Sequence, residues 1–102
     1  MKPRVKLTNA TLISIHSELD DKVPQVLYAI IAEDCECYKK GEILFTSKVM
    51  NVSGLEYRTF GAYFYLLDAE PSELDVSVRE FNLMHDQMYS PEELIQLRRD
   101  NG

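Results

Sequence analysis

The stretch 41–67, GEILFTSKVMNVSGLEYRTFGAYFYLL, constrains the fold most, because two runs rich in β-branched and aromatic residues flank the turn-forming sequence Asn51-Val52-Ser53-Gly54. This pattern predicts one long β-hairpin. A turn centred on Ser53-Gly54 sets the register of the two strands and assigns one of their faces to the core. The residues of this predicted core face are Ile43, Phe45, Ser47 and Val49, opposite Phe64, Ala62, Phe60 and Arg58.

The opposite face of the predicted hairpin is amphipathic, and it is the candidate binding surface of the chain. Its contact residues are Thr46, Lys48, Tyr57, Thr59, Tyr63 and Tyr65. Tyrosine side chains supply large, rigid and partly polar contact area, and they are enriched at protein interfaces. Two alternatives remain open. The C-terminal segment would cover this face in a layered fold, and a bulge at Gly61 would turn every later side chain to the other face.

The length of 102 residues predicts a single domain over residues 1–102, with a core of modest size. The formal net charge of −6 and a pI of about 4.8 disfavour direct contact with nucleic acid, because proteins that bind phosphate backbones carry basic patches. An acidic surface is compatible with a basic protein partner, and it also keeps a small protein soluble.

No contact with a membrane is expected, because the longest uninterrupted apolar run, 26–32, is far shorter than a bilayer-spanning helix. The opening MKPRVKLTNA lacks the apolar stretch of a signal peptide. Cys35 and Cys37, separated by one residue, do not resemble the disulfide framework of a secreted protein. We therefore expect a cytoplasmic protein.

The first part of the chain reads as strands. Alternating apolar residues predict strands over 4–8 and 11–17, or one strand broken at Asn9. The acidic segment 18–24 follows as a hairpin loop. The segment 25–33 is apolar on both alternations, which is typical of a strand buried on both faces, and we place it centrally in the sheet.

After Leu67 the character of the chain changes. Ser72 and Asp75 resemble a capping box, and the spacing of the apolar residues that follow predicts a helix over 72–88. The residues of that helical face are Leu74, Val78, Phe81, His85 and Met88. The alternation of Leu74, Val76 and Val78 also fits a short strand, and this alternative remains open.

The last segment, 89–100, is a clearer helix, with Ser90 as N-cap, Pro91 in the first turn and basic residues in the last turn. Its predicted packing stripe is Leu94, Ile95 and Leu97. Strands first and helices last predict an α+β fold, with a curved antiparallel sheet or partial barrel of about five strands followed by C-terminal helices.

Neither a metal site nor a catalytic site is predicted. Cys35 and Cys37 form one close pair, and His16 and His85 are distant in the sequence, whereas structural zinc usually needs four ligands in two spaced pairs. Ser47 lies within a strand, with no nucleophile elbow and no glycine-rich phosphate loop nearby. We expect no cofactor and favour a protein that is not an enzyme.

The hairpin also carries a pattern, G-x-x-[hydrophobic]-x-T-S-x-V with a later T and Y-x-L. Its residues here are Gly41, Ile43, Thr46-Ser47, Val49, Thr59 and Tyr65-Leu66-Leu67. In this pattern the chain resembles small orphan proteins of mobile elements, such as those of integron gene cassettes and prophages. The resemblance implies a compact α+β or β-rich domain, often a homodimer, without an assigned reaction. This chain departs from the pattern in its aromatic-dense Tyr63-Phe64-Tyr65 and in its longer C-terminal segment.

Three functions follow as hypotheses. The first is a non-enzymatic protein-binding or adaptor module of a mobile element, a homodimer that uses the tyrosine-rich face of the 41–67 hairpin. The second is a small-ligand-binding partial barrel with a pocket lined by Tyr28, Tyr57, Tyr63 and Thr46. The third is an acidic mimic of nucleic acid that inhibits a basic protein. Its acidic residues are Glu18, Asp20, Asp21, Glu33, Asp34 and Glu36.

Overall fold

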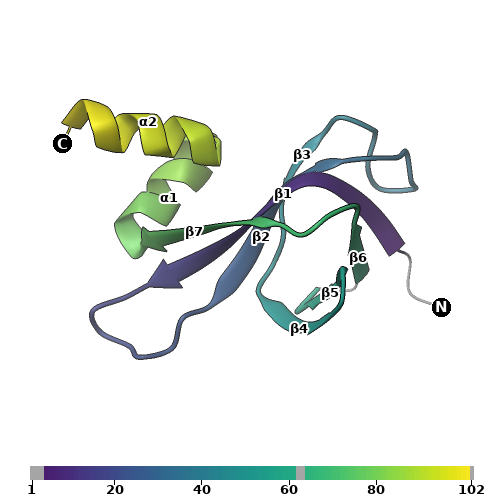
Figure 1. Ribbon diagram of the computed structural model, residues 1–102, viewed down its shortest axis with the longest axis horizontal. Helices are drawn as coiled ribbons and strands as arrows, with labels where there is room; N and C mark the ends of the chain where they lie inside the picture. Colours follow the sequence, from purple (N-terminus) through teal and green to yellow (C-terminus); the bar gives the residue numbers. More distant parts are fainter. Residues whose placement is uncertain (1–3, 62–63, 102) are drawn as a thin grey trace.

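The protein forms an open mixed sheet followed by two helices, in a computed structural model that describes residues 4–61 and 64–101. The elements are β1 (Arg4–His16), β2 (Gln25–Ile31), β3 (Ile43–Phe45), β4 (Val49–Ser53), β5 (Glu56–Thr59), β6 (Phe64–Leu67), β7 (Ser72–Ser77), α1 (Val78–Gln87) and α2 (Pro91–Asn101) (Figure 1). The predicted α+β class with C-terminal helices is confirmed, and the described chain has more strands than the sequence predicted.

The long strand β1 organises the sheet, because it is paired along both of its edges (Figure 1). One edge pairs with β2 in antiparallel orientation, and the other pairs in parallel orientation first with β6 and then with β7. The strand order is β3-β2-β1-β6-β5-β4, and β7 lies off this path beside β1. The sheet is therefore mixed and not purely antiparallel, because the chain returns to β1 after a long excursion that local sequence patterns do not reveal.

A β-bulge interrupts β1 at Asn9 and Ala10, which lie opposite the single residue Ala29. Asn9 has φ +51°, in the left-handed region that asparagine tolerates better than most residues. The extra residue shifts the alternation of β1, so that Leu7 packs into one core cluster and Ile13 into another. The break predicted at Asn9 is thus a bulge within one continuous strand.

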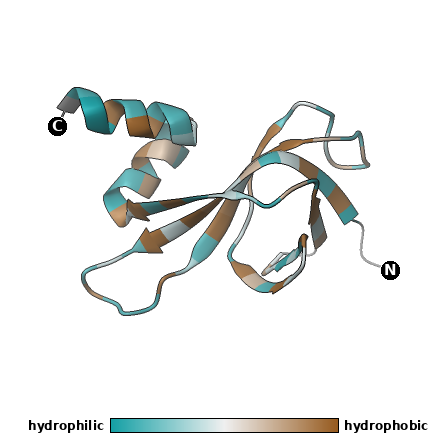
Figure 2. Ribbon diagram, in the orientation of Figure 1, coloured by the Kyte–Doolittle hydropathy of each residue, from teal (hydrophilic) through white to brown (hydrophobic). Residues whose placement is uncertain are grey.

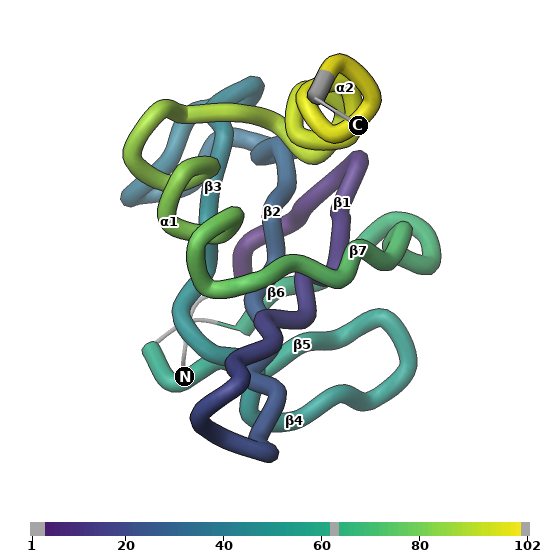
Figure 3. The backbone as a smooth tube through the Cα atoms, turned by 90° about the vertical axis from the view of Figure 1, so that its left-hand side faces the viewer, coloured from purple at the N-terminus to yellow at the C-terminus, as the bar shows by residue number. Residues whose placement is uncertain are grey.

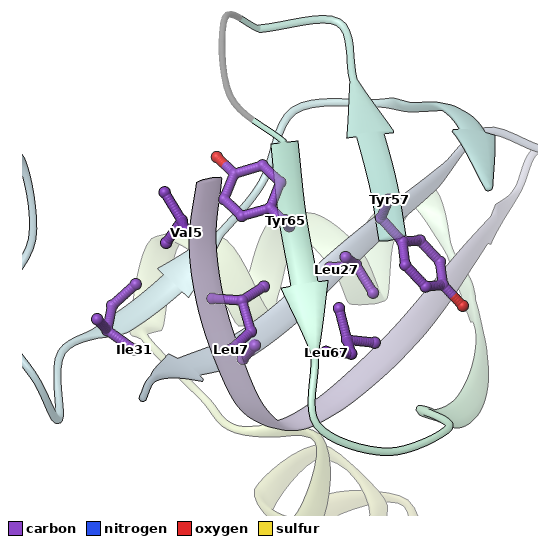
Figure 4. Packing of buried hydrophobic residues seen from close by; sticks show 8 residues of the cluster. Val5, Leu7, Leu27, Ile31, Tyr57, Tyr65 and Leu67 are labelled. Carbon is purple, nitrogen blue, oxygen red and sulfur yellow. The ribbon is translucent and has the colours of Figure 1, made fainter. Parts of the chain in front are cut away.

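Two hydrophobic clusters form the core. The first is enclosed between β1, β2, β5 and β6, and consists of Val5, Leu7, Leu27, Ala29, Ile31, Tyr57, Tyr65 and Leu67 (Figure 4). The second lies under the helices and consists of Ile13, Val26, Tyr28, Val76, Met84 and Leu94. β2 contributes to both because its successive side chains point to opposite faces, which confirms the predicted strand buried on both sides. Figure 2 shows hydrophobic residues recurring along β1 and β2.

The helices lie together at the end of the molecule opposite β4 and β5 (Figure 3). α1 starts with a capping box, in which Ser77 Oγ accepts from the Glu80 N–H and Glu80 Oε1 accepts from the Ser77 N–H, both at 3.0 Å. The predicted start of the last helix at Ser90 and Pro91 is confirmed, and Ser90 forms the same reciprocal arrangement with Glu93.

Arg98 of α2 fastens the helical layer to the sheet. Its Nε donates to Glu80 Oε2 at 2.6 Å, and its Nη2 donates to Glu80 Oε1 and to the Asp75 carbonyl oxygen, both at 2.8 Å. These bonds add to the apolar packing of α2, because fewer of its predicted packing residues are buried than expected. Leu94 is buried, whereas Ile95 is exposed.

The predicted hairpin over 41–67 is wrong outside 49–59. β4 and β5 do form a hairpin, but its two-residue loop is Gly54-Leu55, one position later than predicted, and Gly54 has φ +60°. Moving the turn by one position shifts the pairing of the two strands by two residues, so the same side chains share each face of β5 as in the predicted register. β3 belongs elsewhere in the sheet, because Ile43 pairs with Ile30 of β2 and not with the strand after the turn.

The predicted helix over 72–88 begins only at Val78, because 72–77 form β7. The strand alternation that the sequence left open is therefore the correct alternative for this part. β1 supplies the backbone partners of β7, and Val76 is buried in the second cluster. The predicted capping box of Ser72 and Asp75 is wrong for the same reason, since both residues are paired with β1.

Candidate functional site

The predicted tyrosine face lies largely inside the protein. Its buried residues are Thr46, Tyr57, Thr59 and Tyr65. Lys48 is exposed, and Tyr63 lies outside the described residues. Along β5 the face predicted to be free points inward, because Tyr57 and its cross-strand partner Tyr65 pack into the first cluster. These four side chains are therefore part of the interior and not an exposed contact surface.

The two buried tyrosines have a packing role. Tyr57 and Tyr65 belong to the first cluster with Val5 and Leu67, and Figure 4 shows their hydroxyl oxygens pointing away from it. Such a placement buries the ring and keeps the polar end at the edge. Burial raises the pKa of Tyr57, and the negative charge of Glu70 raises it further. Packing in the first cluster therefore accounts for the burial of both tyrosine rings.

The two buried threonines differ in their hydrogen bonds. Thr46 Oγ1 accepts a hydrogen bond from the Leu27 N–H at 3.0 Å and donates to the Ser47 carbonyl oxygen at 2.8 Å. Thr46 therefore fastens the end of β3 to β2. Thr59 Oγ1 is buried and has no hydrogen-bond partner among the described residues.

A groove of about 560 Å³ opens beside the bulge of β1, on the face of the sheet that carries the helices. We call it the bulge groove. It forms because β6 leaves β1 at Leu67 and β7 rejoins it at Ser72, so that β1 is unpaired on this edge along the bulge. Its lining residues are Thr8, Asn9, Ala10, Thr11, Tyr28, Ile30, Asp68, Ala69, Glu70, Ser72, Pro91 and Glu92.

Tyr28 is the most deeply buried polar side chain of the bulge groove, with 8% of its surface exposed. Its ring packs edge-on against Phe45, with the ring centroids 4.9 Å apart. Its hydroxyl forms no hydrogen bond with any described residue. Burial raises the pKa of Tyr28, and the charges of Glu92 and Glu93 raise it further, so the phenol is neutral at physiological pH.

The carboxyl groups of the bulge groove differ in their partners. Asp68 Oδ2 accepts a hydrogen bond from Thr8 Oγ1 at 2.7 Å, which joins the connection after β6 to the bulge. Glu70 and Glu92 form no hydrogen bond or ion pair with the described part of the chain. The groove thus combines hydroxyl groups, negative charge and one buried phenol.

The other candidate residues do not assemble. Cys35 and Cys37 are exposed and form no disulfide. His16 Nε2 lies 2.9 Å from Asp75 Oδ1, and His85 lies against the rings of Phe45 in β3 and Phe81 in α1. Within residues 4–61 and 64–101, no group of three or more His, Cys, Asp or Glu side chains is arranged to hold a metal ion. None of the helices in these ranges is long and apolar enough to cross a membrane.

Ser47, considered from the sequence as a nucleophile, also has a structural partner. Its Oγ accepts a hydrogen bond from the Gly61 N–H at 2.9 Å. A side chain at Gly61 would lie 3.3 Å from this oxygen, so the glycine permits the contact.

No protein-family model, curated protein or solved structure matches this chain. The resemblance to small proteins of mobile elements therefore stays a prediction. The homodimer and the acidic-mimic hypothesis stay predictions as well.

The sequence pointed to Tyr28 as a pocket residue but grouped it with the wrong neighbours. Thr46 and Tyr57, expected beside it, are not among the lining residues of the bulge groove. The signals for the true neighbours were the interruption at Asn9 and the turn-forming sequence 68–71. Both read as strand boundaries, and only the parallel pairing of β6 and β7 with β1 brings them together.

Proposed function

We propose that this protein is a non-enzymatic binding domain, and that its site is the bulge groove, which takes a small ligand. The sequence favoured a binding module without catalysis. The small-ligand alternative is better supported than a protein contact through the hairpin, because the tyrosines that motivated that contact are interior residues.

One observation carries this proposal. Tyr28 is nine-tenths buried at the bulge groove, yet its hydroxyl has no hydrogen-bond partner in the described chain. A tyrosine whose ring is buried and whose hydroxyl has no protein partner leaves that hydroxyl available to water or to a ligand. The protein gains nothing for its own fold from this hydroxyl.

The size and lining of the groove agree with this role. Its volume of about 560 Å³ falls within the range of roughly 300–1,000 Å³ that is common for ligand pockets. Ile30 and Pro91 offer apolar contact, and Thr8, Thr11 and Ser72 offer hydroxyl groups. Binding is favoured over catalysis because the lining residues include no histidine, cysteine or lysine.

A screen of a metabolite library against the isotope-labelled protein tests the proposal. We expect at least one compound to raise the melting temperature and to shift the amide signals of Asn9, Thr11 and Ser72, because binding to the native state stabilises it. Tyr28→Phe should weaken this binding by about threefold to tenfold, which corresponds to one lost hydrogen bond. Its own stability should stay close to that of the parent, since the hydroxyl has no protein partner.

Tyr57→Phe is the matched control, because Tyr57 is equally buried but belongs to the first cluster, away from the groove. It should leave ligand affinity unchanged. A library in which no compound shifts the groove amides would overturn the proposal, and so would binding that is indifferent to Tyr28→Phe.

The cytoplasmic homodimer of a mobile element remains part of the proposal. Two exposed cysteines that form no disulfide, Cys35 and Cys37, support a reducing compartment. Light scattering over a range of protein concentrations tests the dimer, and the neighbouring genes test the mobile-element origin.

A further inference from the structure

The charge of the bulge groove restricts the ligand that it favours. Its lining residues include the acidic Asp68, Glu70 and Glu92, and the described lining residues include no lysine, arginine or histidine. A concave surface of one charge sign raises the local concentration of ions of the opposite sign. The groove therefore favours a cation over a neutral or anionic ligand.

These negative charges are not neutralised within the described chain. Only Asp68 has a hydrogen-bond donor, the hydroxyl of Thr8, and this donor is uncharged. Glu70 and Glu92 have neither a hydrogen bond nor an ion pair with residues 4–61 or 64–101. Unpaired surface carboxylates are common by themselves, so the case for a site needs a second, independent feature.

Tyr28 is that second feature. Tyr28 lines the same groove, its side chain is nine-tenths buried, and the described chain offers its hydroxyl no partner. A neutral phenol oxygen accepts a hydrogen bond from an ammonium group. The groove thus offers a cation both negative charge and a fixed neutral acceptor.

An anion is disfavoured here although the N-terminus of α2 lies at the groove. Ser90 Oγ already accepts from the Glu93 N–H at 3.1 Å, which caps the helix. Glu92 and Glu93 place two negative charges in the first turn. These charges offset the positive end of the helix dipole that would otherwise attract a phosphate or carboxylate.

The remaining lining selects the shape of the cation. Ile30, Ala69 and Pro91 give the groove apolar surface between its polar groups. A bare metal ion makes no use of such surface, whereas a hydrocarbon stem removes it from water. The combination matches an aliphatic chain with positive charge.

We propose that the bulge groove binds a small aliphatic amine, with an ammonium group hydrogen-bonded to Tyr28 Oη and paired with Glu70 or Glu92, and with its stem on Ile30 and Pro91. This inference rests on the proposed ligand-binding function and adds the chemical class of the ligand.

Three compounds of the same chain length test which ligand charge the groove prefers. They are the diamine cadaverine, the neutral pentanediol and the anionic glutarate. Each is titrated into isotope-labelled protein at low ionic strength, with Mg²⁺ alone and Ca²⁺ alone as further arms. We expect cadaverine to shift the amides of Asn9, Thr11, Ser72 and Glu92, and its affinity to fall as salt is added, because exposed charges are screened.

Charge-removing variants test the contacts. Glu70→Gln and Glu92→Gln should each weaken cadaverine by roughly twofold to fivefold, as expected for exposed ion pairs. Tyr28→Phe should weaken it by about tenfold, because a hydrogen bond from a charged donor is lost. Glu36→Gln removes the same charge from an exposed connection outside the groove, and it should leave the affinity unchanged.

Each contrary result has a distinct meaning. Tyr28-dependent binding of pentanediol, glutarate or another uncharged or anionic compound, without binding of cadaverine, would overturn the amine and leave the ligand-binding function intact. Displacement of cadaverine by a divalent metal ion that shifts the same amides would replace the amine with a metal site. If the affinity for cadaverine is the same in Glu70→Gln and Glu92→Gln as in the parent, cadaverine binds outside the groove and the inference is overturned. If no compound of this set or of the metabolite library shifts the amide signals of the groove, both proposals are overturned.

Discussion

Asn9 has more influence on this fold than its exposed side chain indicates. Its left-handed backbone conformation creates the bulge that moves the side chains of β1 from one face of the sheet to the other. Without the extra residue, Leu7 and Ile13 would lie on the same face of the sheet and could not pack into different clusters. The same bulge forms one wall of the groove.

Asn9→Val should therefore lower the free energy of unfolding by about 1–2 kcal/mol, because a β-branched residue is strained at φ +51°. Asn9→Gly should leave the stability nearly unchanged, since glycine adopts this conformation without strain. Urea denaturation of both variants measures the difference. Thr11→Val places the same side chain at an ordinary position of β1, and it should change the stability much less. Equal stability of Asn9→Val and the parent would contradict the left-handed conformation at this residue.

At the scale of elements, Glu80 joins three parts of the chain. It completes the N-terminal cap of α1 and pairs with Arg98 of α2, which in turn donates to the Asp75 carbonyl oxygen of β7. The hydrogen bond from Arg98 is the main cause that holds the pKa of Glu80 below its ordinary value of 4.5. A lowered pKa in the folded state means that the ionised carboxylate stabilises the fold.

Glu80→Gln should lower the free energy of unfolding at neutral pH by about 0.5–1 kcal/mol, the size of a partly exposed ion pair. This difference in the free energy of unfolding should be fully present above the ordinary pKa of a glutamate. It should disappear as the pH falls through the lowered pKa of Glu80, because the parent protein then loses the same negative charge. Urea denaturation across acidic and neutral pH measures it.

Glu93→Gln is the control for the cap. Glu93 holds the corresponding position in the capping box of α2, glutamine serves equally well there, and Glu93 has no ion pair with the described residues. Glu93→Gln should therefore change the free energy of unfolding of the protein little at any pH. A pH-independent loss in Glu80→Gln would attribute the effect to the cap and not to Arg98.

At the scale of the whole molecule, β1 and β2 run through both hydrophobic clusters. β5 and β6 close the first cluster, and the helices with β7 close the second at the other end of the molecule (Figure 3). Because both clusters are built on the same pair of strands, the loss of one removes support from the other. We therefore expect one cooperative unfolding transition.

Met84→Ala tests this cooperativity, because Met84 is fully buried in the second cluster. The substitution should cost about 2–5 kcal/mol. Native-state amide hydrogen exchange should show the loss in the most protected amides of β5 and β6 as well as in those of α1. A loss confined to β7 and the helices would show two units that unfold separately.

The sequence by itself determined the elements whose signals are local. The apolar segment after Pro24 specified β2, the cap at Ser90 with Pro91 specified the start of α2, and Asn9 marked the irregularity in the first strand. The order of strands and helices along the chain was enough for the α+β class. These features depend on side-chain periodicity, proline geometry and capping, which act within a few residues.

Only the tertiary structure decided which face of the 41–67 stretch is interior, whether 72–77 is helix or strand, and where the groove lies. The alternation of side chains separates the two faces of β5 but does not say which one is buried, and the packing of Tyr57 with β1, β2 and β6 decides it. The segment 72–77 fits either state until β1 offers it a free edge. The bulge groove joins Tyr28 with the segment at 68–72 and the start of α2. These groups meet because parallel pairing depends on contacts between residues far apart in the chain, which the spacing of side chains along one segment does not encode.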